Sequence, residues 1–315
     1  MVKAPALAAL MGSLLLVAGC AKKPGAAAAP AAAEPEAPAA EPLRAAFSAQ
    51  ELGDPVDWKS LTEKDKALLD AFINHDVEKA KAALKQGANP NLRCGRGLTT
   101  VMLAAAMGSR DLVAALREAG ARDGQDAGPY LEILEFPDRA KGPEFRAALG
   151  DIERATGKPP VARGTRGEYA FELPADKVRA FLDGNCESLL KKGCFVFVND
   201  QHFGINGKPD ALLALPTTNQ FAVMAYAGVD GANYDIDNYL VIKWMKRLDA
   251  QQPYRITACG GDFISGRFKG KIADPAAMAK AMYDFCPDIV DQGVGSVEAL
   301  AKELAKTGEL YFWWD

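Results

Sequence analysis

The chain has 315 residues, of which 49% are apolar and 25% charged, and its formal net charge is −4. This composition is that of a globular protein with room for one or two domains, and it excludes a largely disordered chain. The mildly acidic balance lacks a basic cluster dense enough to neutralise a phosphate backbone, so we expect no nucleic-acid partner.

The N-terminus combines a short basic start at Lys3 with an apolar run over 4–19. This run is shorter than the about 20 residues that cross a bilayer, which favours a signal peptide over 1–19. The residues Leu-Val-Ala-Gly-Cys at 16–20 resemble the lipobox of bacterial lipoproteins. The resemblance implies cleavage before Cys20, a diacylglyceryl thioether on its sulfur and an acylated new N-terminus. Because Ala21 follows, it also implies a lipid anchor in the outer membrane of the cell envelope, facing the periplasm.

Residues 20–50 consist of the expected lipidated cysteine and a stretch dominated by alanine and proline. Such a stretch has too few large apolar side chains to offset the entropy lost on ordering. We therefore predict a disordered linker between the membrane and the folded part of the chain.

The segment 58–126 contains an internal repeat. Gly87-Ala88 recurs as Gly120-Ala121 at an offset of 33 residues, and one fixed period is typical of stacked helical units. The run Gly-Leu-Thr-Thr-Val-Met-Leu-Ala-Ala at 97–105 resembles an ankyrin repeat, with threonine and methionine where that pattern has proline and histidine. The resemblance implies a pair of ankyrin repeats and a surface for a protein partner. Because about three units make a free-standing stack, we expect one end to dock on a flanking helix or on the downstream domain.

From 128 to 315 the pattern changes to interleaved strands and helices, which predicts one α/β or α+β domain with a mixed sheet. Periodicity predicts helices over 144–156, 175–191, 238–249, 275–285 and 297–306. It predicts strands over 130–136, 169–173, 194–198, 221–226, 254–258, 266–270 and 310–315. The last strand is apolar on both faces, which favours a position inside the sheet.

Rare residues recur in order through the second half of this domain. They include Asn233-Tyr234, Trp244, the Gly-Gly-Asp-Phe run at 260–263, the segment 285–293 and the terminal Phe-Trp-Trp-Asp at 312–315. Together they resemble the bacterial family called domain of unknown function 4253, over about 200–315. That resemblance implies a domain boundary and no defined activity.

Five cysteines remain once Cys20 is lipidated. In an oxidising periplasm four of them could form two disulfides, and the favoured pairs are Cys186 with Cys194 and Cys259 with Cys286. The alternative is that they are small buried apolar residues. Zinc is not expected, because the chain lacks a Cys-x-x-Cys pair and has two histidines in total.

Few residues of the C-terminal domain suggest chemistry. His202 follows a predicted strand and could join Asp262, Trp313 and Trp314 in a cleft; the alternative is that the tryptophans belong to the core. A nucleophile and base formed by Cys286 and His202 is a further alternative. The acidic segment 230–238 suggests either a calcium loop or a turn in which Asp237 or Asn238 caps a helix.

These observations favour a membrane-tethered lipoprotein that acts as a protein-interaction module, with no cofactor and no assigned catalytic residue. The alternative is that the C-terminal domain is an undescribed enzyme or a small-ligand-binding domain. A cleft that gathers His202, Asp262 and Trp313 or Trp314 would favour the alternative.

Overall fold

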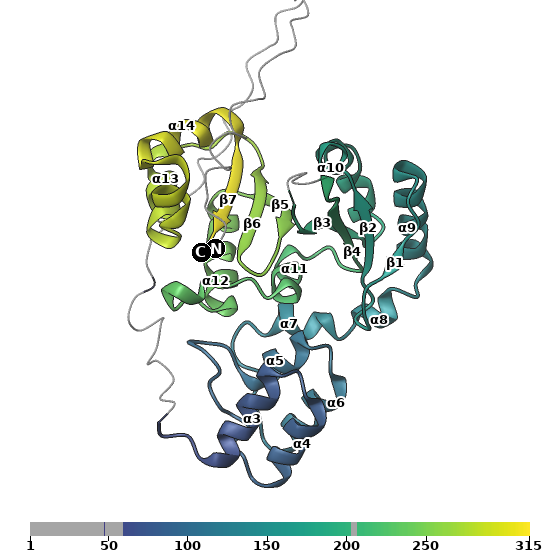
Figure 1. Ribbon diagram of the computed structural model, residues 1–315, viewed down its shortest axis with the longest axis vertical. Helices are drawn as coiled ribbons and strands as arrows, with labels where there is room; N and C mark the ends of the chain where they lie inside the picture. The colour runs from purple at the N-terminus through teal and green to yellow at the C-terminus, as the bar shows by residue number, and fades with distance from the viewer. Residues whose placement is uncertain (1–46, 48–58, 203–206) are drawn as a thin grey trace, which may run out of the picture.

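The computed structural model describes residue 47 and residues 59–202 and 207–315. The predicted signal peptide, the lipidation of Cys20 and nearly all of the predicted linker lie outside the described residues. The described chain forms a helical lobe over 59–126, hereafter the hairpin lobe, and a larger sheet domain above it (Figure 1). In the described part of the chain, no helix has both the length and the apolarity to cross a membrane.

The hairpin lobe consists of two helical hairpins of the same construction. Its helices are α3 (Glu63–Ile73), α4 (Val77–Lys85), α5 (Thr100–Ala106) and α6 (Arg110–Glu118). A Thr, Asp or Ser side chain at the N-cap of each helix accepts a hydrogen bond from a free backbone N–H. Gly87 and Gly120 follow α4 and α6 with φ of 87° and 94°, so both glycines adopt the left-handed conformation that suits glycine at a helix end.

A mixed seven-stranded sheet forms the second lobe, in the order β1-β2-β4-β3-β5-β6-β7. Its strands are β1 (Val161–Ala162), β2 (Tyr169–Leu173), β3 (Phe195–Asp200), β4 (Asp210–Leu215), β5 (Tyr254–Cys259), β6 (Phe263–Phe268) and β7 (Glu309–Trp313). All neighbours are antiparallel except β3 and β5, which pair in parallel at Val198 and Ala258. The predicted mixed sheet is therefore confirmed.

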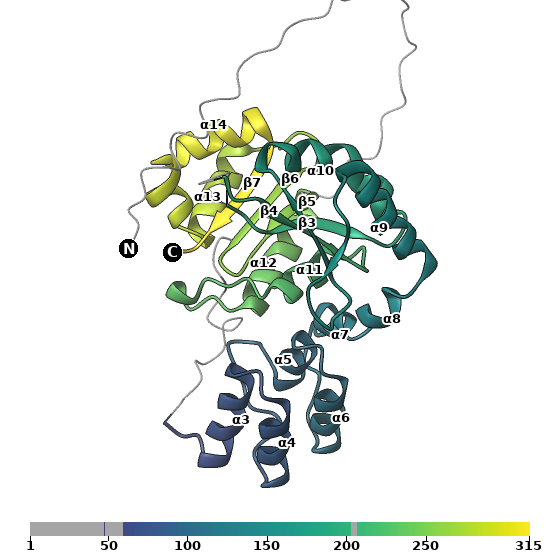
Figure 2. The ribbon, with the colours of Figure 1, turned by 45° about the vertical axis from the view of Figure 1, so that its right-hand side comes forward.

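Helices cover both faces of this sheet (Figure 2). α9 (Pro143–Thr156) and α10 (Ala175–Leu190) pack on one face through a core that includes Phe145, Phe181 and Val196. On the other face lie α11 (Gln220–Ala227) and α12 (Asn238–Gln251). Beside β7 the chain adds α13 (Pro275–Phe285), the π-helical turn η3 (Ile289–Val294) and α14 (Val297–Thr307).

Aromatic side chains join α12, α13 and β7. The Trp244 and Phe285 rings stack at 4.3 Å, and Phe312 meets both edge-on. Trp314 packs beside Phe312 and is 3% exposed. The core interpretation of the aromatic C-terminus thus holds for Phe312 and Trp314, but β7 is an edge strand and not an interior one.

Two predicted strands are wrong. Residues 130–136 belong to α7 (Gly128–Ile133) and to the start of α8 (Phe136–Arg139), and residues 221–226 lie in α11. α11 is buried between the sheet, α7 and α12, so its sequence is apolar on all sides and carries no helical period. The predicted strand at 266–270 starts three residues and ends two residues later than β6, and β4 was not predicted.

The hairpin lobe docks on the sheet domain, as the count of two repeat units led us to expect. α7 packs between α5 and α11, and its buried Tyr130 hydroxyl donates to Asn238 Oδ1 at 2.7 Å. A second contact comes from the loop between the two hairpins, where the Arg96 backbone N–H donates to Asp237 Oδ2 at 2.7 Å. The loop between the two hairpins, which contains Arg96, therefore contacts this chain's own sheet domain.

Candidate functional site

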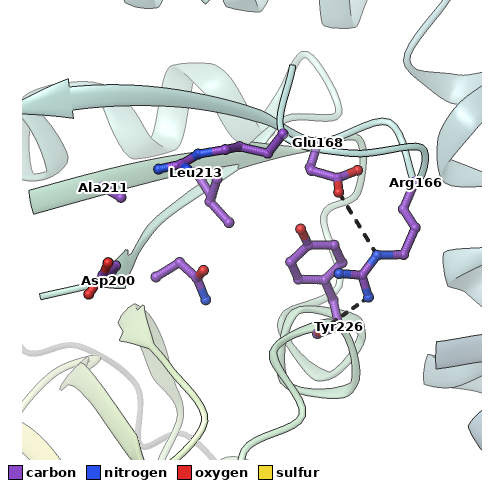
Figure 3. A pocket seen from close by; sticks show the side chains of 8 residues that line it. Arg166, Glu168, Asp200, Ala211, Leu213 and Tyr226 are labelled. Carbon is purple, nitrogen blue, oxygen red and sulfur yellow. Dashed lines mark hydrogen bonds and ion pairs between the residues drawn. The ribbon is translucent and has the colours of Figure 1, made fainter. Parts of the chain in front are cut away.

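A pocket of about 240 Å³ opens on the face of the sheet that carries α11, beyond the end of that helix (Figure 3). Three segments supply its walls: the loop between β1 and β2, the ends of β3 and β4, and α11. The lining residues are Arg163, Arg166, Glu168, Asn199, Asp200, Ala211, Leu213 and Tyr226. The lining thus combines polar and charged side chains with two apolar ones, Ala211 and Leu213.

Glycines shape the loop that holds the charged residues. At Gly167, φ is 84° and a Cβ atom would lie 2.7 Å from the Phe136 carbonyl oxygen. A Cβ on Gly164 would lie 2.4 Å from Glu168 Oε1. Any larger residue would strain the backbone at 167 or displace the carboxylate at 168, so this loop is built around Glu168.

Glu168 is a buried carboxylate with an unused acceptor. Its side chain is 4% exposed, and Oε1 lies 3.9 Å from Arg166 Nε, an ion pair too long for a hydrogen bond. No group among the described residues donates to Oε2. A buried polar atom without a partner costs roughly 1–3 kcal/mol, which makes this oxygen the strongest sign of a ligand in the pocket.

Arg166 links the pocket to the hairpin lobe through hydrogen bonds. Its Nη1 donates to the carbonyl oxygens of Ala106 at 2.9 Å and Tyr226 at 3.5 Å, which belong to the last turns of α5 and α11. The guanidinium also lies 3.9 Å from the centre of the Tyr226 ring. A cation is favourable at two helix C-termini, so the main role of Arg166 is structural.

Tyr226 presents a protonated hydroxyl to the pocket. Burial raises its pKa to about 12, and the neighbouring Glu168 carboxylate acts in the same direction, while Arg166 opposes it. Hydrogen bonding to the Glu168 carboxylate is a further cause of the raised pKa, although Oε2 of that carboxylate has no donor among the described residues. Tyr226 is therefore a hydrogen-bond donor at physiological pH and not a base.

The opposite wall contains Asn199 and Asp200 at the end of β3. The Asn199 amide donates to the Cys259 carbonyl at 3.0 Å, which leaves its own oxygen as an acceptor. The Asp200 side chain is 61% exposed, and its Oδ2 lies 3.4 Å from His202 Nε2. The predicted His202 therefore lies beside a lining residue.

The predicted cleft of His202, Asp262, Trp313 and Trp314 is not formed as one site. His202 follows β3, whereas the tryptophans end β7, three strands away in the sheet, or about 14 Å at the usual strand spacing. Asp262 and Trp314 are neighbours, because the Asp262 carbonyl accepts from the Trp314 N–H at 3.0 Å. The same separation divides His202 from Cys286, whose Sγ lies 3.0 Å from the Trp313 carbonyl oxygen.

The acidic segment 230–238 forms a turn and a helix start, with a 3-10 turn η2 (Ala232–Tyr234). Asp237 caps α12 by accepting from the Leu240 N–H at 2.9 Å. The helix-cap alternative is thus confirmed for Asp237. Within 59–202 and 207–315, His, Cys, Asp and Glu residues form no group of three or more that could hold a metal ion.

The five described cysteines are free thiols in the structure. Cys186 and Cys194 belong to the core beneath α10, and Cys259 and Cys286 to the core beneath α12 and α13. Neither disulfide is present, and the two pairings stay predictions for an oxidised form. Burial raises the pKa of Cys186 to about 11 and that of Cys286 to about 12, so neither thiol is a ready nucleophile.

Comparison with known proteins supports the expected resemblance at the C-terminus. Residues 211–315, a third of the chain, match the family model described as Domain of unknown function (DUF4253). No curated protein and no solved structure matches the chain. The match begins within β4, so it includes Ala211, Leu213 and Tyr226 of the pocket and leaves out the five polar residues of the other walls.

Sequence reasoning missed most of this pocket. Arg163, Arg166 and Glu168 lie in a segment where the sequence predicted neither helix nor strand, and their role depends on contacts with residues far along the chain. The pair of glycines at 164 and 167 was the available signal, because two glycines around a charged residue indicate a tight, constrained loop.

Proposed function

We propose that the protein is a lipid-anchored binding protein of the bacterial envelope, and that its pocket at Glu168 takes a small polar ligand. The anchor rests on the lipobox resemblance at Cys20. The binding role rests on one observation: the Glu168 carboxylate, which is 4% exposed, lines the pocket and keeps one oxygen, Oε2, that accepts no hydrogen bond from the described residues. A ligand that donates to this oxygen would remove the cost of leaving it bare.

Binding fits the pocket better than catalysis does. Arg166 is held by helix carbonyls, Tyr226 stays protonated because its pKa is about 12, and His202 faces Asp200 and not a hydroxyl or thiol. A nucleophile needs a base within hydrogen-bond reach, and the described lining supplies fixed donors and acceptors instead.

A thermal-shift screen of polar metabolites on the detergent-solubilised full-length chain tests this proposal. Hits should raise the unfolding midpoint of the parent protein and lose that effect in Glu168→Gln. Glu172→Gln is the matched control, because Glu172 lies on β2, the strand that directly follows Glu168, with its side chain exposed. Hits that stabilise Glu168→Gln equally would place the ligand elsewhere and overturn the proposal.

The anchor has its own test. Cys20→Ser should release the chain from membranes into the soluble fraction, because the thioether needs the cysteine sulfur. Continued labelling of this variant with a fatty-acid probe would contradict the lipoprotein assignment.

A protein partner on the hairpin lobe is the second candidate function. The ankyrin resemblance supports it, and so does Ile73, a large apolar side chain that is 72% exposed at the end of α3. Affinity recovery of the solubilised lipoprotein, compared with Ile73→Asp, tests this candidate. A stoichiometric protein that the variant loses would support it, whereas equal recovery with both chains would count against it.

A further inference from the structure

Resting on the proposed function, we infer that the pocket binds a small zwitterion with a protonated amine and a carboxylate, such as an amino acid or a dipeptide. Two charged groups that line the pocket carry this inference. They are the carboxylate of Glu168, whose Oε2 has no donor among the described residues, and the guanidinium of Arg163.

The amine is assigned to Glu168. Glu168 lines the pocket, and its buried Oε2 accepts no hydrogen bond from the residues that the structure describes, so this carboxylate keeps an acceptor for a donor of the ligand. Arg166 already binds two helix carbonyls and lies 3.9 Å from Oε1, which leaves the carboxylate only partly compensated. An ammonium group supplies both the missing donor and the missing positive charge, and such charge-assisted hydrogen bonds are the strong ones.

The carboxylate is assigned to Arg163. This residue is exposed on the pocket wall, and its guanidinium makes no hydrogen bond or ion pair with the described residues. Arginine presents a planar fork that matches a carboxylate. A ligand with only a positive charge would leave Arg163 unpaired, and one with only a negative charge would meet Glu168 and Asp200. A zwitterion satisfies both sides.

The volume limits the size of the ligand. At about 240 Å³ the pocket is smaller than the roughly 300–1,000 Å³ of sites for drug-sized molecules. The Asn199 oxygen and the Tyr226 hydroxyl add one acceptor and one donor between the charged groups. This volume suits an amino acid or a dipeptide better than a longer peptide.

Calorimetric titration of the solubilised full-length chain distinguishes the charge classes. The probes are the free amino acids, alanyl-alanine, N-acetyl-alanyl-alanine and alanyl-alanine amide. We expect at least one free amino acid or the unmodified dipeptide to bind, and which of them binds separates the two sources of the zwitterion. N-acetylation, amidation and Glu168→Gln should each weaken binding by about 10- to 100-fold, the loss of one charge-assisted contact.

Matched variants complete the test. Arg163→Gln should weaken the zwitterion about 10-fold and leave the amide unchanged, whereas Glu172→Gln and Arg122→Gln, on exposed positions away from the pocket, should bind normally. Equal binding of blocked and unblocked probes would overturn the zwitterion while the pocket stands. A metabolite screen without any Glu168-dependent hit would overturn the pocket itself.

Discussion

Arg166 connects the pocket loop to the hairpin lobe through the Ala106 carbonyl, and Arg166→Met tests how much this side chain stabilises the fold. Methionine keeps much of the aliphatic stem and removes the charge and the hydrogen-bond donors. Four contacts are lost: the hydrogen bonds to the Ala106 carbonyl at 2.9 Å and the Tyr226 carbonyl at 3.5 Å, the cation–π contact with the Tyr226 ring and the ion pair with Glu168. Glu168 then remains as a carboxylate that is 4% exposed and without a countercharge.

The expected cost in the free energy of unfolding is about 3–5 kcal/mol. A hydrogen bond from a charged donor contributes roughly 1.5–3 kcal/mol and the cation–π contact about 1 kcal/mol. Breaking a buried ion pair by removing one partner costs about 3–5 kcal/mol, and the 3.9 Å separation places this pair toward the lower end. These contributions overlap, so they are not added.

Denaturant unfolding of four chains measures this effect: the parent, Arg166→Met, Glu168→Gln and the double variant. If the uncompensated carboxylate dominates, the double variant should recover about 1–2 kcal/mol of the loss in Arg166→Met, because glutamine needs no countercharge. Strictly additive costs would refute this reasoning and leave Arg166 as a helix-capping residue alone.

Three further results are expected. Gly167→Ala should lower the free energy of unfolding by about 2–4 kcal/mol in thermal or denaturant unfolding, because the left-handed backbone is strained by a Cβ that would lie 2.7 Å from the Phe136 carbonyl oxygen. Gly157→Ala is the control and should cost only about 1–2 kcal/mol, because φ is 67° there and no atom lies within 4 Å of the added Cβ. A hydrogen bond from the Asn89 N–H lowers the pKa of Asp65. The ionised Asp65 side chain therefore stabilises the fold above about pH 4, and this contribution is lost as the pH falls through the folded pKa. Asp65→Asn should make the free energy of unfolding less dependent on pH in this acidic range. The described thiols should resist a disulfide reagent at pH 8 until the chain unfolds, because burial raises their pKa.

Each of these results can fail in a distinct way. Equal costs for the two glycine variants would mean that the carbonyl contact at 167 is relieved cheaply. An unchanged acid limb in Asp65→Asn would assign the pH dependence to other carboxylates. Stoichiometric labelling of a thiol in the folded protein would show that the core opens locally.

The sequence predicted the elements whose pattern is local and missed those set by burial. α13 (Pro275–Phe285) was predicted to the residue, because Asp274 and Pro275 mark its start. For α11 the apolar run alone favoured a strand, although Asn219 before it and Gly228 after it are helix signals at both ends. β4 is buried on both faces, so its residues do not alternate and no period marks it.

The candidate site was less predictable than the fold. His202 was found from its place after a strand, but the residue with the strongest physical signal, Glu168, looks in the sequence like any surface glutamate. Its burial follows from the docking of Phe136 and Arg166 around a glycine loop, and these are contacts between segments that no spacing rule connects.

The position of β4 in the sheet determines where a recombinant fragment of this protein can begin. The segment that matches the family model starts at 211, yet β4 pairs with β2 on one side and β3 on the other, and both precede that start. A recombinant fragment cut at 211 would present a hydrophobic strand with two open edges, which is a template for aggregation. The matched segment is thus not a folding unit in this chain, and a fragment meant for biophysical work should begin before α7.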